Sequence, residues 1–264
     1  MALGSALDAI PGVRAFKRRY HRWTPLYPAP IEGQYHSSGY LIFDPGIPEA
    51  TLDAATKEML ESEPIKGKEW HHGARYFDGW RTCPAIKEIA LAPRVLRLLR
   101  QVYDRELLPF QTLNFPVGTE QRVHSDAIHF NSDPATYMCG VWVALEDIDL
   151  GNGALVYYPG SHKLPVVTME DFAPGPGAAH YPLYEAYIAK YVEDHKLVAE
   201  RAILKKGQAL LWASNLLHGG GTHADKSRTR FSQVTHYFFE GCSNFTPLES
   251  YGGYRHLRKR DWVA

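Results

Sequence analysis

The sequence QRVHSDAIHF, residues 121–130, places His124 and Asp126 two positions apart. We expect a β-strand here, on which the side chains of residues i and i+2 leave the same face, so that the imidazole and the carboxylate project together. Histidine and aspartate are both common metal ligands. A third ligand would have to come from a distant part of the chain, and His218 in the segment NLLHGGG is the candidate.

An HxD pair alone is weak evidence for a metal site. With 13 His and 13 Asp among 264 residues, about 0.6 such pairs are expected by chance. The surroundings of His218 strengthen the case, because it follows a predicted apolar strand, residues 209–212, and precedes three glycines. Glycines there would let the backbone bend closely around a bound group.

Arg230 adds a second feature to this predicted site. It lies twelve residues after His218, at the start of another predicted strand, where its guanidinium could hold a carboxylate through two hydrogen bonds. Two histidines and one carboxylate on one side of an iron ion leave three positions open, as non-haem Fe(II) oxygenases require. Together these residues predict a site for Fe(II) and 2-oxoglutarate.

The composition narrows the class of protein. Lys+Arg and Asp+Glu both number 29, and basic residues are spread out except at the two ends, so nucleic acid is not an expected partner. Residues 1–23 lack an apolar signal core, and no later stretch could span a membrane. Three separated cysteines without CxxC spacing indicate neither a disulfide framework nor a zinc-thiolate site. We expect a soluble, cytoplasmic protein.

Hydrophobic spacing predicts helices at residues 48–62, 93–103 and 182–195, and a short strand at residues 40–43. After Leu107 the chain changes to short β-rich runs separated by turn signals such as Asn-Gly and Pro-Gly. This texture predicts a mainly β fold with flanking helices, a double-stranded β-helix of the jelly-roll or cupin-like kind.

We expect one domain over residues 1–264. Its predicted parts are an N-terminal helical and substrate-covering part (1–106), a jelly-roll core (107–240) and a C-terminal tail (241–264).

Three segments carry a resemblance to a known family: QRVHSDAIHF, VWVALEDIDLGNGALVYYPGSHK and GQALLWASNLLHGGGTHADKSRTRF. In this order they resemble the phytanoyl-CoA dioxygenase family of Fe(II)/2-oxoglutarate oxygenases, over about half the chain. The resemblance implies that His124, Asp126 and His218 are the iron ligands and that Arg230 binds 2-oxoglutarate, with Arg228 as the alternative arginine. It also implies O2 as a co-substrate. Related halogenases replace the carboxylate ligand, so the intact Asp126 argues against halogenation.

Four further residues are weaker candidates for contacts with 2-oxoglutarate. Trp142 lies where the family has a pocket-lining strand, although plain core packing is the alternative. Gln111 and Asn114 lie on the strand before the metal pair, where an ordinary strand role is the alternative. Ser232 shares a face with Arg230 by the period of two. We expect His129, His162, His223 and His236 to be structural or solvated.

The resemblance implies oxidation of a substrate C–H bond, with hydroxylation as the default and desaturation, ring closure, epoxidation or demethylation as alternatives. Aromatic residues of the N-terminal third and of residues 169–195 are expected at the pocket mouth. They suit a polar or glycosidic small molecule at least as well as an acyl chain, and no basic cluster near them indicates a grip for coenzyme A. A small metabolite or natural-product intermediate is the expected substrate.

Two other classes of function stay open at this point. The first is a catalytically silent jelly-roll protein that binds a small molecule. The second is a hydrolase or isomerase that uses another divalent metal, because affinity alone does not select iron. A homodimer is possible, since aromatic residues near the C-terminus could dock on a second subunit.

Overall fold

The computed structural model describes residues 30–70, 74–258 and 261–263. Its largest element is an antiparallel six-stranded sheet with the order β1-β8-β5-β10-β3-β2. The strands are β1 (Tyr40–Phe43), β2 (Tyr76–Phe77), β3 (Leu107–Phe115), β5 (Met138–Ala144), β8 (Ala209–Ala213) and β10 (Ser232–Phe239).

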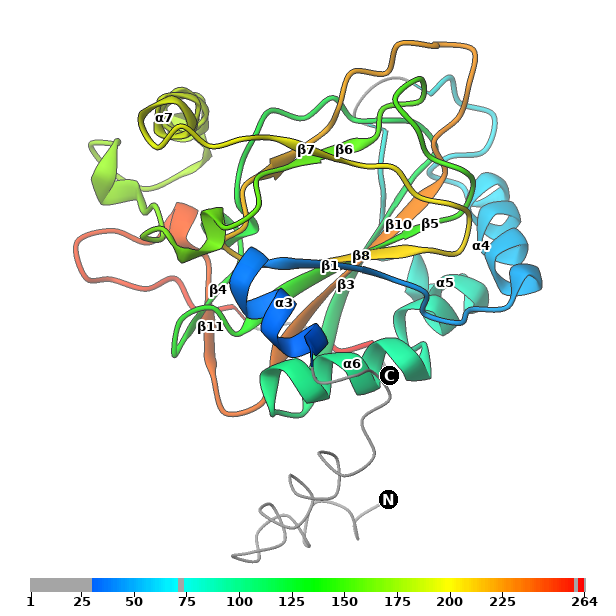
Figure 1. Cartoon of the computed structure of the whole chain (residues 1–264), viewed down its shortest axis with the longest axis horizontal. Helices are drawn as coiled ribbons and strands as arrows, with labels where there is room; N and C mark the ends of the chain where they lie inside the picture. Colours follow the sequence, from blue (N-terminus) through cyan, green and yellow to red (C-terminus); the bar gives the residue numbers. More distant parts are fainter. Residues whose placement is uncertain (1–29, 71–73, 259–260, 264) are drawn as a thin grey trace, which may run out of the picture.

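A smaller sheet lies across from the large one (Figure 1), with the order β7-β6-β9. Its strands are β6 (Leu155–Tyr157), β7 (Glu200–Ala202) and β9 (His218–Gly219), and a separate pair joins β4 (Asn131–Asp133) to β11 (Ser243–Phe245). Two facing antiparallel sheets make the double-stranded β-helix that the sequence predicts.

Strand β5 shows how both faces of the large sheet are buried. Cys139, Val141 and Val143 point into the cluster shared with the helices, whereas Trp142 and Ala144 point into the cluster between the two sheets. The same alternation holds along β8. Because successive side chains leave opposite faces, one strand supports two hydrophobic layers. The layer between the two sheets contributes side chains to the wall of the candidate site.

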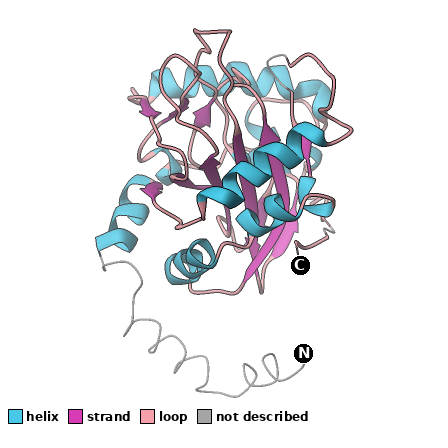
Figure 2. Ribbon diagram, turned by 90° about the vertical axis from the view of Figure 1, so that its right-hand side faces the viewer, coloured by secondary structure: helices cyan, strands magenta, loops and turns pink. Residues whose placement is uncertain are grey.

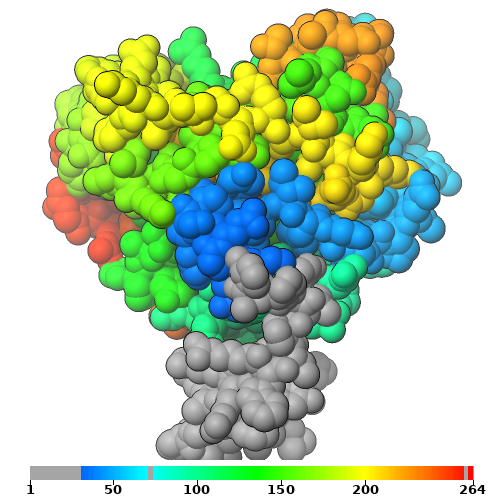
Figure 3. Space-filling view, viewed as in Figure 1, coloured from blue at the N-terminus to red at the C-terminus, as the bar shows by residue number. Residues whose placement is uncertain are grey.

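Helices cover the outer face of the large sheet (Figure 2), as α4 (Glu49–Glu61), α5 (Pro84–Ala90) and α6 (Pro93–Tyr103) contribute buried side chains to its outer cluster. Figure 3 shows the blue segment of α3 (Pro30–Ser38) and β1 against the yellow segment that leads into β8, consistent with the pairing of β1 with β8. The helices predicted at 48–62 and 93–103 and the strand at 40–43 are confirmed. The sequence analysis did not predict α3 or α5.

The helix predicted at 182–195 is confirmed as α7 (Tyr181–Asp194). It buries Tyr184 and Ile188 in a cluster with Ile128 and Leu217. Ser125 donates its backbone N–H to the Tyr184 hydroxyl at 2.8 Å. This contact fixes α7 to the loop that carries the two predicted ligands.

The strand predicted at residues 121–130 is wrong. His124 makes only an isolated bridge, and a 3-10 helix, η2 (Asp126–Ile128), begins at Asp126. The backbone turns because Phe130 and His129 donate N–H groups to the Asp126 carbonyl at 2.8 Å and 2.9 Å. The two side chains therefore converge through a turn rather than through the strand period.

The terminal parts of the chain contribute to the sheets as well as to their cover. Strands β1 and β2 come from the first 106 residues and complete the edges of the large sheet, while β11 pairs with β4. No helix in the described part of the chain has the length and apolar content needed to cross a membrane.

Candidate active site

His124 and His218 are brought together by their own backbones. Each donates its N–H to the other's carbonyl oxygen at 2.8 Å, which forms the bridge between the ligand loop and β9. Their ring centroids lie 4.5 Å apart. The glycines that follow His218 permit this approach, since a Cβ on Gly219 would lie 2.8 Å from the Gln121 carbonyl oxygen. The three glycines noted in the sequence thus allow the loop to lie close to β9.

Both histidines present the same nitrogen to one point. The His124 Nδ1 lies 3.0 Å from the Arg122 carbonyl oxygen, and the His218 Nδ1 lies 2.9 Å from the Leu216 carbonyl oxygen. A carbonyl oxygen only accepts, so each Nδ1 carries the proton and each Nε2 is an unprotonated acceptor. The Gln121 amide nitrogen lies 3.3 Å from the His124 Nε2. Burial, followed by the charge of His218, lowers the pKa of His124 to about 3, which keeps its imidazole neutral.

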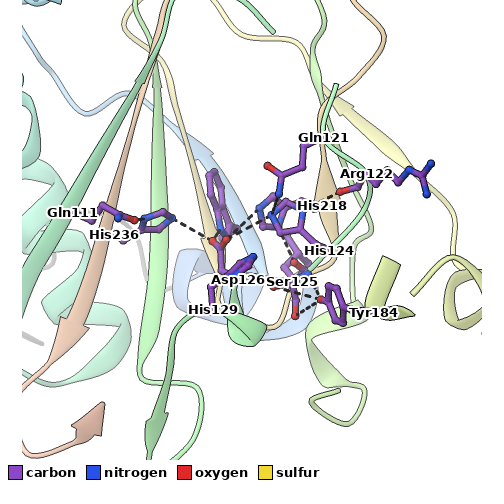
Figure 4. Close-up of polar contacts among 12 residues, drawn as sticks. Gln111, Gln121, Arg122, His124, Ser125, Asp126, His129, Tyr184, His218 and His236 are labelled. Atoms are coloured by element: carbon purple, nitrogen blue, oxygen red, sulfur yellow. Dashed lines mark hydrogen bonds and ion pairs between the residues drawn. The ribbon is translucent and has the colours of Figure 1, made fainter. Parts of the chain in front are cut away.

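Asp126 completes the cluster (Figure 4). Its Oδ1 lies 3.8 Å from the Nε2 of both His124 and His218. Its Oδ2 accepts a 2.7 Å hydrogen bond from the Trp212 indole N–H and lies 3.4 Å from the His236 Nε2. Burial raises the pKa of Asp126, but the neighbouring histidines outweigh burial and lower it below its usual range. Asp126 is therefore an anion with one oxygen held and the other aimed at the histidines.

These three residues form a site of the right size and chemistry for a metal ion. The ligand atoms of His124, Asp126 and His218 all lie within 4.8 Å of one another, and all three residues are buried. Hydrogen bonds from the far side of each ligand fix its orientation, as the outer partners of metal ligands commonly do.

The cluster lies on the wall of a cavity of about 370 Å³. Arg230 is on the same cavity wall and is only 3% exposed. Its Cζ lies 5.2 Å from the Trp142 ring centroid and 5.7 Å from that of Phe115. Its Nε is buried without a hydrogen-bond partner among the described residues. Burial lowers the pKa of Arg230 to about 10, so the guanidinium stays charged at neutral pH. A buried charge of this kind is stabilised by an anionic ligand.

A model of the phytanoyl-CoA dioxygenase family matches residues 35–230, which is 196 of the 264 residues. The chain belongs to the phytanoyl-CoA dioxygenase family. This confirms the family that the three sequence segments indicated.

Relatives in this family are distant. The phytanoyl-CoA dioxygenase domain-containing protein 1 of Danio rerio is 30% identical over 152 residues, covering 55% of this chain and 48% of that protein. The ectoine dioxygenase of Nocardia farcinica is 26% identical over 189 residues, covering 64% and 61%. The chain spans about half the length of the curated relatives it matches first.

Solved structures confirm the fold. EctD from S. alaskensis, in a structure with 2-oxoglutarate and 5-hydroxyectoine, has a TM-score of 0.67 at 16% identity, covering 90% of this chain and 87% of that one. The epimerase SnoN, in complex with Fe3+, alpha ketoglutarate and nogalamycin RO, has a TM-score of 0.66 at 18% identity, covering 88% and 95%. At these identities the likeness establishes the double-stranded β-helix common to this family.

The alternative arginine, Arg228, does not line the cavity. Its guanidinium donates to both carboxylate oxygens of Asp149, at 2.9 Å and 3.0 Å, and its side chain is 37% exposed. Arg230 lies two residues further on, just before β10 rather than within it, and donates its backbone N–H to the Pro116 carbonyl. Of these two arginines, Arg230 is the buried one that lines the cavity.

The weaker candidates differ in whether they line the cavity, and strand parity accounts for Gln111 and Asn114. Gln111 and Trp142 line the cavity. Asn114 does not, because it is an odd number of positions from Gln111 and donates across the other side of the sheet to Gln233 at 3.1 Å. Ser232 is fully buried outside the cavity lining, and its hydroxyl donates to the Arg230 carbonyl at 3.4 Å.

His236 lines the cavity, although the sequence analysis expected it to be structural or solvated. Its Nδ1 lies 3.1 Å from Gln111 Oε1, and its Nε2 faces Asp126 Oδ2 (Figure 4). The signal was available in the sequence, since His236 is an even number of positions from Arg230 along the same predicted strand. His129 also lines the cavity, and its Nε2 lies 3.3 Å from the Tyr181 hydroxyl.

Arg75 and Arg258 line the cavity as well, although no sequence motif contains them. Trp70, Tyr76 and Trp80, expected at the pocket mouth, pack instead with the outer hydrophobic cluster.

Proposed function

We propose that this protein is an Fe(II)- and 2-oxoglutarate-dependent oxygenase that oxidises, by default hydroxylates, a C–H bond of a small-molecule metabolite. The observation that carries the proposal is one cavity wall that holds both the His124, Asp126 and His218 cluster and the buried Arg230. Membership of the phytanoyl-CoA dioxygenase family supports the same reaction class.

The residues present fit an iron ion. Both histidines are held as Nδ1–H tautomers, so their Nε2 atoms are the available donors, and Asp126 adds one oxygen. A set of two imidazoles and one carboxylate suits Fe(II) and leaves positions for other groups. The anionic Asp126 offsets part of the metal charge, and the Trp212 indole prevents its carboxylate from rotating.

The residues also fit 2-oxoglutarate. Arg230 would hold the distal carboxylate, because its guanidinium is buried, charged and has an unused Nε–H donor among the described residues. Trp142 and Phe115 flank the guanidinium and keep water from it. Gln111 lines the same wall within reach of His236 and can add a hydrogen bond.

When bound, iron, 2-oxoglutarate and O2 would supply the oxidising chemistry. The protein's part is to bind these groups, to orient the substrate and to exclude water. The cavity wall includes Leu113, Leu155 and Val234, which exclude water from the site. Phe77, at 58% exposure, lines the cavity at its solvent side, and substrate would pass beside it.

Anaerobic titration of 2-oxoglutarate into the Fe(II)-loaded protein tests the proposal. Wild type should develop the visible charge-transfer band of the iron chelate. His218→Ala should lose the band because it removes one of three ligands, and Arg230→Ala should require at least tenfold more 2-oxoglutarate because a charged hydrogen bond is lost. Arg228→Ala is the matched control and should titrate like wild type, since Arg228 pairs with Asp149 outside the cavity.

Absence of the band in iron-loaded wild type would contradict the proposal. The silent binding protein and the enzyme with another divalent metal would then be the readings to pursue. If the band forms, succinate release in the presence of candidate substrates identifies the compound that is oxidised.

A further inference from the structure

His129 is a cavity residue to which the proposed function gives no role. It lines the cavity, and its ring centroid lies 6.4 Å from that of the ligand candidate His124. Its ring stacks on Tyr181, the first residue of α7, with centroids 5.3 Å apart and an interplanar angle of 29°. A helix outside the two facing sheets therefore fixes the orientation of this cavity residue.

A series of hydrogen bonds leads from Arg75 to His129, and the direction of each bond follows from the one before. Arg75 donates to Gln121 Oε1 at 2.8 Å, and a guanidinium has no acceptor that could reverse this bond. The Gln121 amide therefore turns its NH2 group away from Arg75. That nitrogen lies 3.3 Å from the His124 Nε2, so the series passes beside the ligand cluster.

The Tyr181 hydroxyl is the next group in the series. Burial is the largest effect on its pKa and raises it to about 12, so the phenol keeps its proton at neutral pH. A hydrogen bond with Gln121 lowers the same pKa, as a bond donated to the phenol oxygen does. Because that oxygen accepts from Gln121, its own O–H is left for the His129 Nε2, which lies 3.3 Å away.

The bond from Tyr181 decides which nitrogen of His129 carries the proton. An Nε2 that accepts from Tyr181 is unprotonated, so the neutral ring carries its proton on Nδ1. Packing alone does not account for this arrangement, because a phenyl ring at residue 129 would stack on Tyr181 equally well and would leave its hydroxyl without this acceptor. The series therefore prepares an N–H donor on a ring that lines the cavity.

We propose that the Nδ1–H group of His129 donates a hydrogen bond to an oxygen atom of the substrate, and that Tyr181 is the residue that positions this donor. The inference rests on the proposed function and names the substrate class as an oxygen-bearing small molecule with a hydroxyl, ether or carbonyl group. An oxygen held by His129 lies close to the ligand cluster, so the carbon atoms next to that oxygen are the ones presented for oxidation.

Two probes of the same shape test the donor in anaerobic protein loaded with Fe(II) and saturated with 2-oxoglutarate. Cyclohexanone offers an oxygen acceptor, whereas methylenecyclohexane carries a CH2 group in its place. Calorimetry gives the dissociation constant of each probe. The ratio of the two constants is the ketone preference, and its change between wild type and a variant cancels the apolar contacts that the probes share.

Variants assign the ketone preference to His129. His129→Phe should lower it about fivefold, which is the net contribution of one hydrogen bond. His129→Asn keeps an N–H group near the position of Nδ1 and should retain most of the preference. Tyr181→Phe leaves the imidazole without its fixed tautomer and should lower the preference by a smaller factor. Tyr187→Phe is the matched control, since Tyr187 lies on the same helix but stacks on Tyr191, and it should behave like wild type.

A second measurement on His129 does not depend on iron. Nitrogen NMR of the metal-free protein, labelled in histidine, reports the tautomer of each imidazole, and the signals that disappear in His129→Asn belong to His129. We expect the Nδ1–H tautomer in wild type and a mixture of tautomers in Tyr181→Phe. An Nε2–H tautomer in wild type would overturn the proposal.

Three results of the binding test would also overturn it. Cyclohexanone does not bind, or the ketone preference survives in His129→Phe, or the preference falls as far in His129→Asn as in His129→Phe, which would mean that the imidazole only packs. A protein that forms the charge-transfer band but fails these tests refutes the His129 donor alone. A missing band refutes the proposed function, and the NMR measurement then decides on the donor by itself.

Discussion

At the scale of single residues, the indole N–H of Trp212 is the group that positions Asp126. The bond to Oδ2 is 2.7 Å long and fully buried, so it fixes which oxygen faces His124 and His218. Trp212→Phe deletes the donor and keeps most of the packing. We expect the affinity for Fe(II) to fall about 10- to 100-fold, measured by anaerobic calorimetry, because partners behind metal ligands contribute that much.

Trp142→Phe is the matched control for this substitution. Trp142 is buried in the same inter-sheet cluster and lies beside Arg230, but it makes no hydrogen bond to a ligand. Its Fe(II) affinity should equal that of wild type. Equal losses of Fe(II) affinity in the two variants would mean that the Trp212 indole contributes through packing and not by positioning Asp126.

At the scale of elements, the pairing of β5 with β8 explains why residue 140 is glycine. Gly140 is opposite Trp212, and a Cβ there would lie 2.5 to 2.7 Å from three atoms of the indole. Gly140→Ala should therefore displace Trp212. We expect a loss of about 1–3 kcal/mol in the free energy of unfolding by urea, as for other overpacked cores, together with weaker Fe(II) binding.

Gly175→Ala serves as the control, since a Cβ there meets nothing within 4 Å. It should leave stability and Fe(II) affinity unchanged. If Gly140 acts on the metal through Trp212, the double variant Gly140→Ala/Trp212→Phe should lose no more Fe(II) affinity than Trp212→Phe alone. Additive losses would show that the strand pairing affects the site by another route.

Elements also show how far the sequence could predict this site. The ligands, Arg230 and the helices follow from residue types and local spacing. The turn at Asp126 does not, because the strand expected at 121–130 is replaced by reciprocal backbone bonds between His124 and His218, which are distant in sequence. Strand parity, applied to β3, would have rejected Asn114 in favour of Gln111.

At the scale of the whole molecule, Arg75 and Arg258 line the cavity although no local sequence pattern predicts this. Each lies in an irregular segment, and only the closed fold places both on the cavity wall. These parts of the cavity wall come from the segment before β2 and from the C-terminal tail, whereas the metal-ligand candidates come from the jelly-roll core.

Because the metal-ligand candidates come from distant parts of the chain, we expect metal binding to stabilise the whole fold. Asp126 and His218 are 92 positions apart, so a metal held by both joins the ligand loop to β9 and would be lost on unfolding. At a concentration one hundred times its dissociation constant, the metal should add about 2.7 kcal/mol. For a chain of this size that corresponds to a rise of about 5–10 °C in the melting temperature, measured anaerobically with and without Fe(II).

The comparison is made within each variant, because a buried substitution shifts the metal-free melting temperature by itself. His218→Ala should show little or no rise with Fe(II), since two ligands bind far more weakly than three. Arg230→Ala should show the full rise, because Arg230 is assigned to the co-substrate rather than to the metal. A full rise in His218→Ala would place the stabilising metal elsewhere in the chain, and the link between the ligand cluster and the fold would then be refuted.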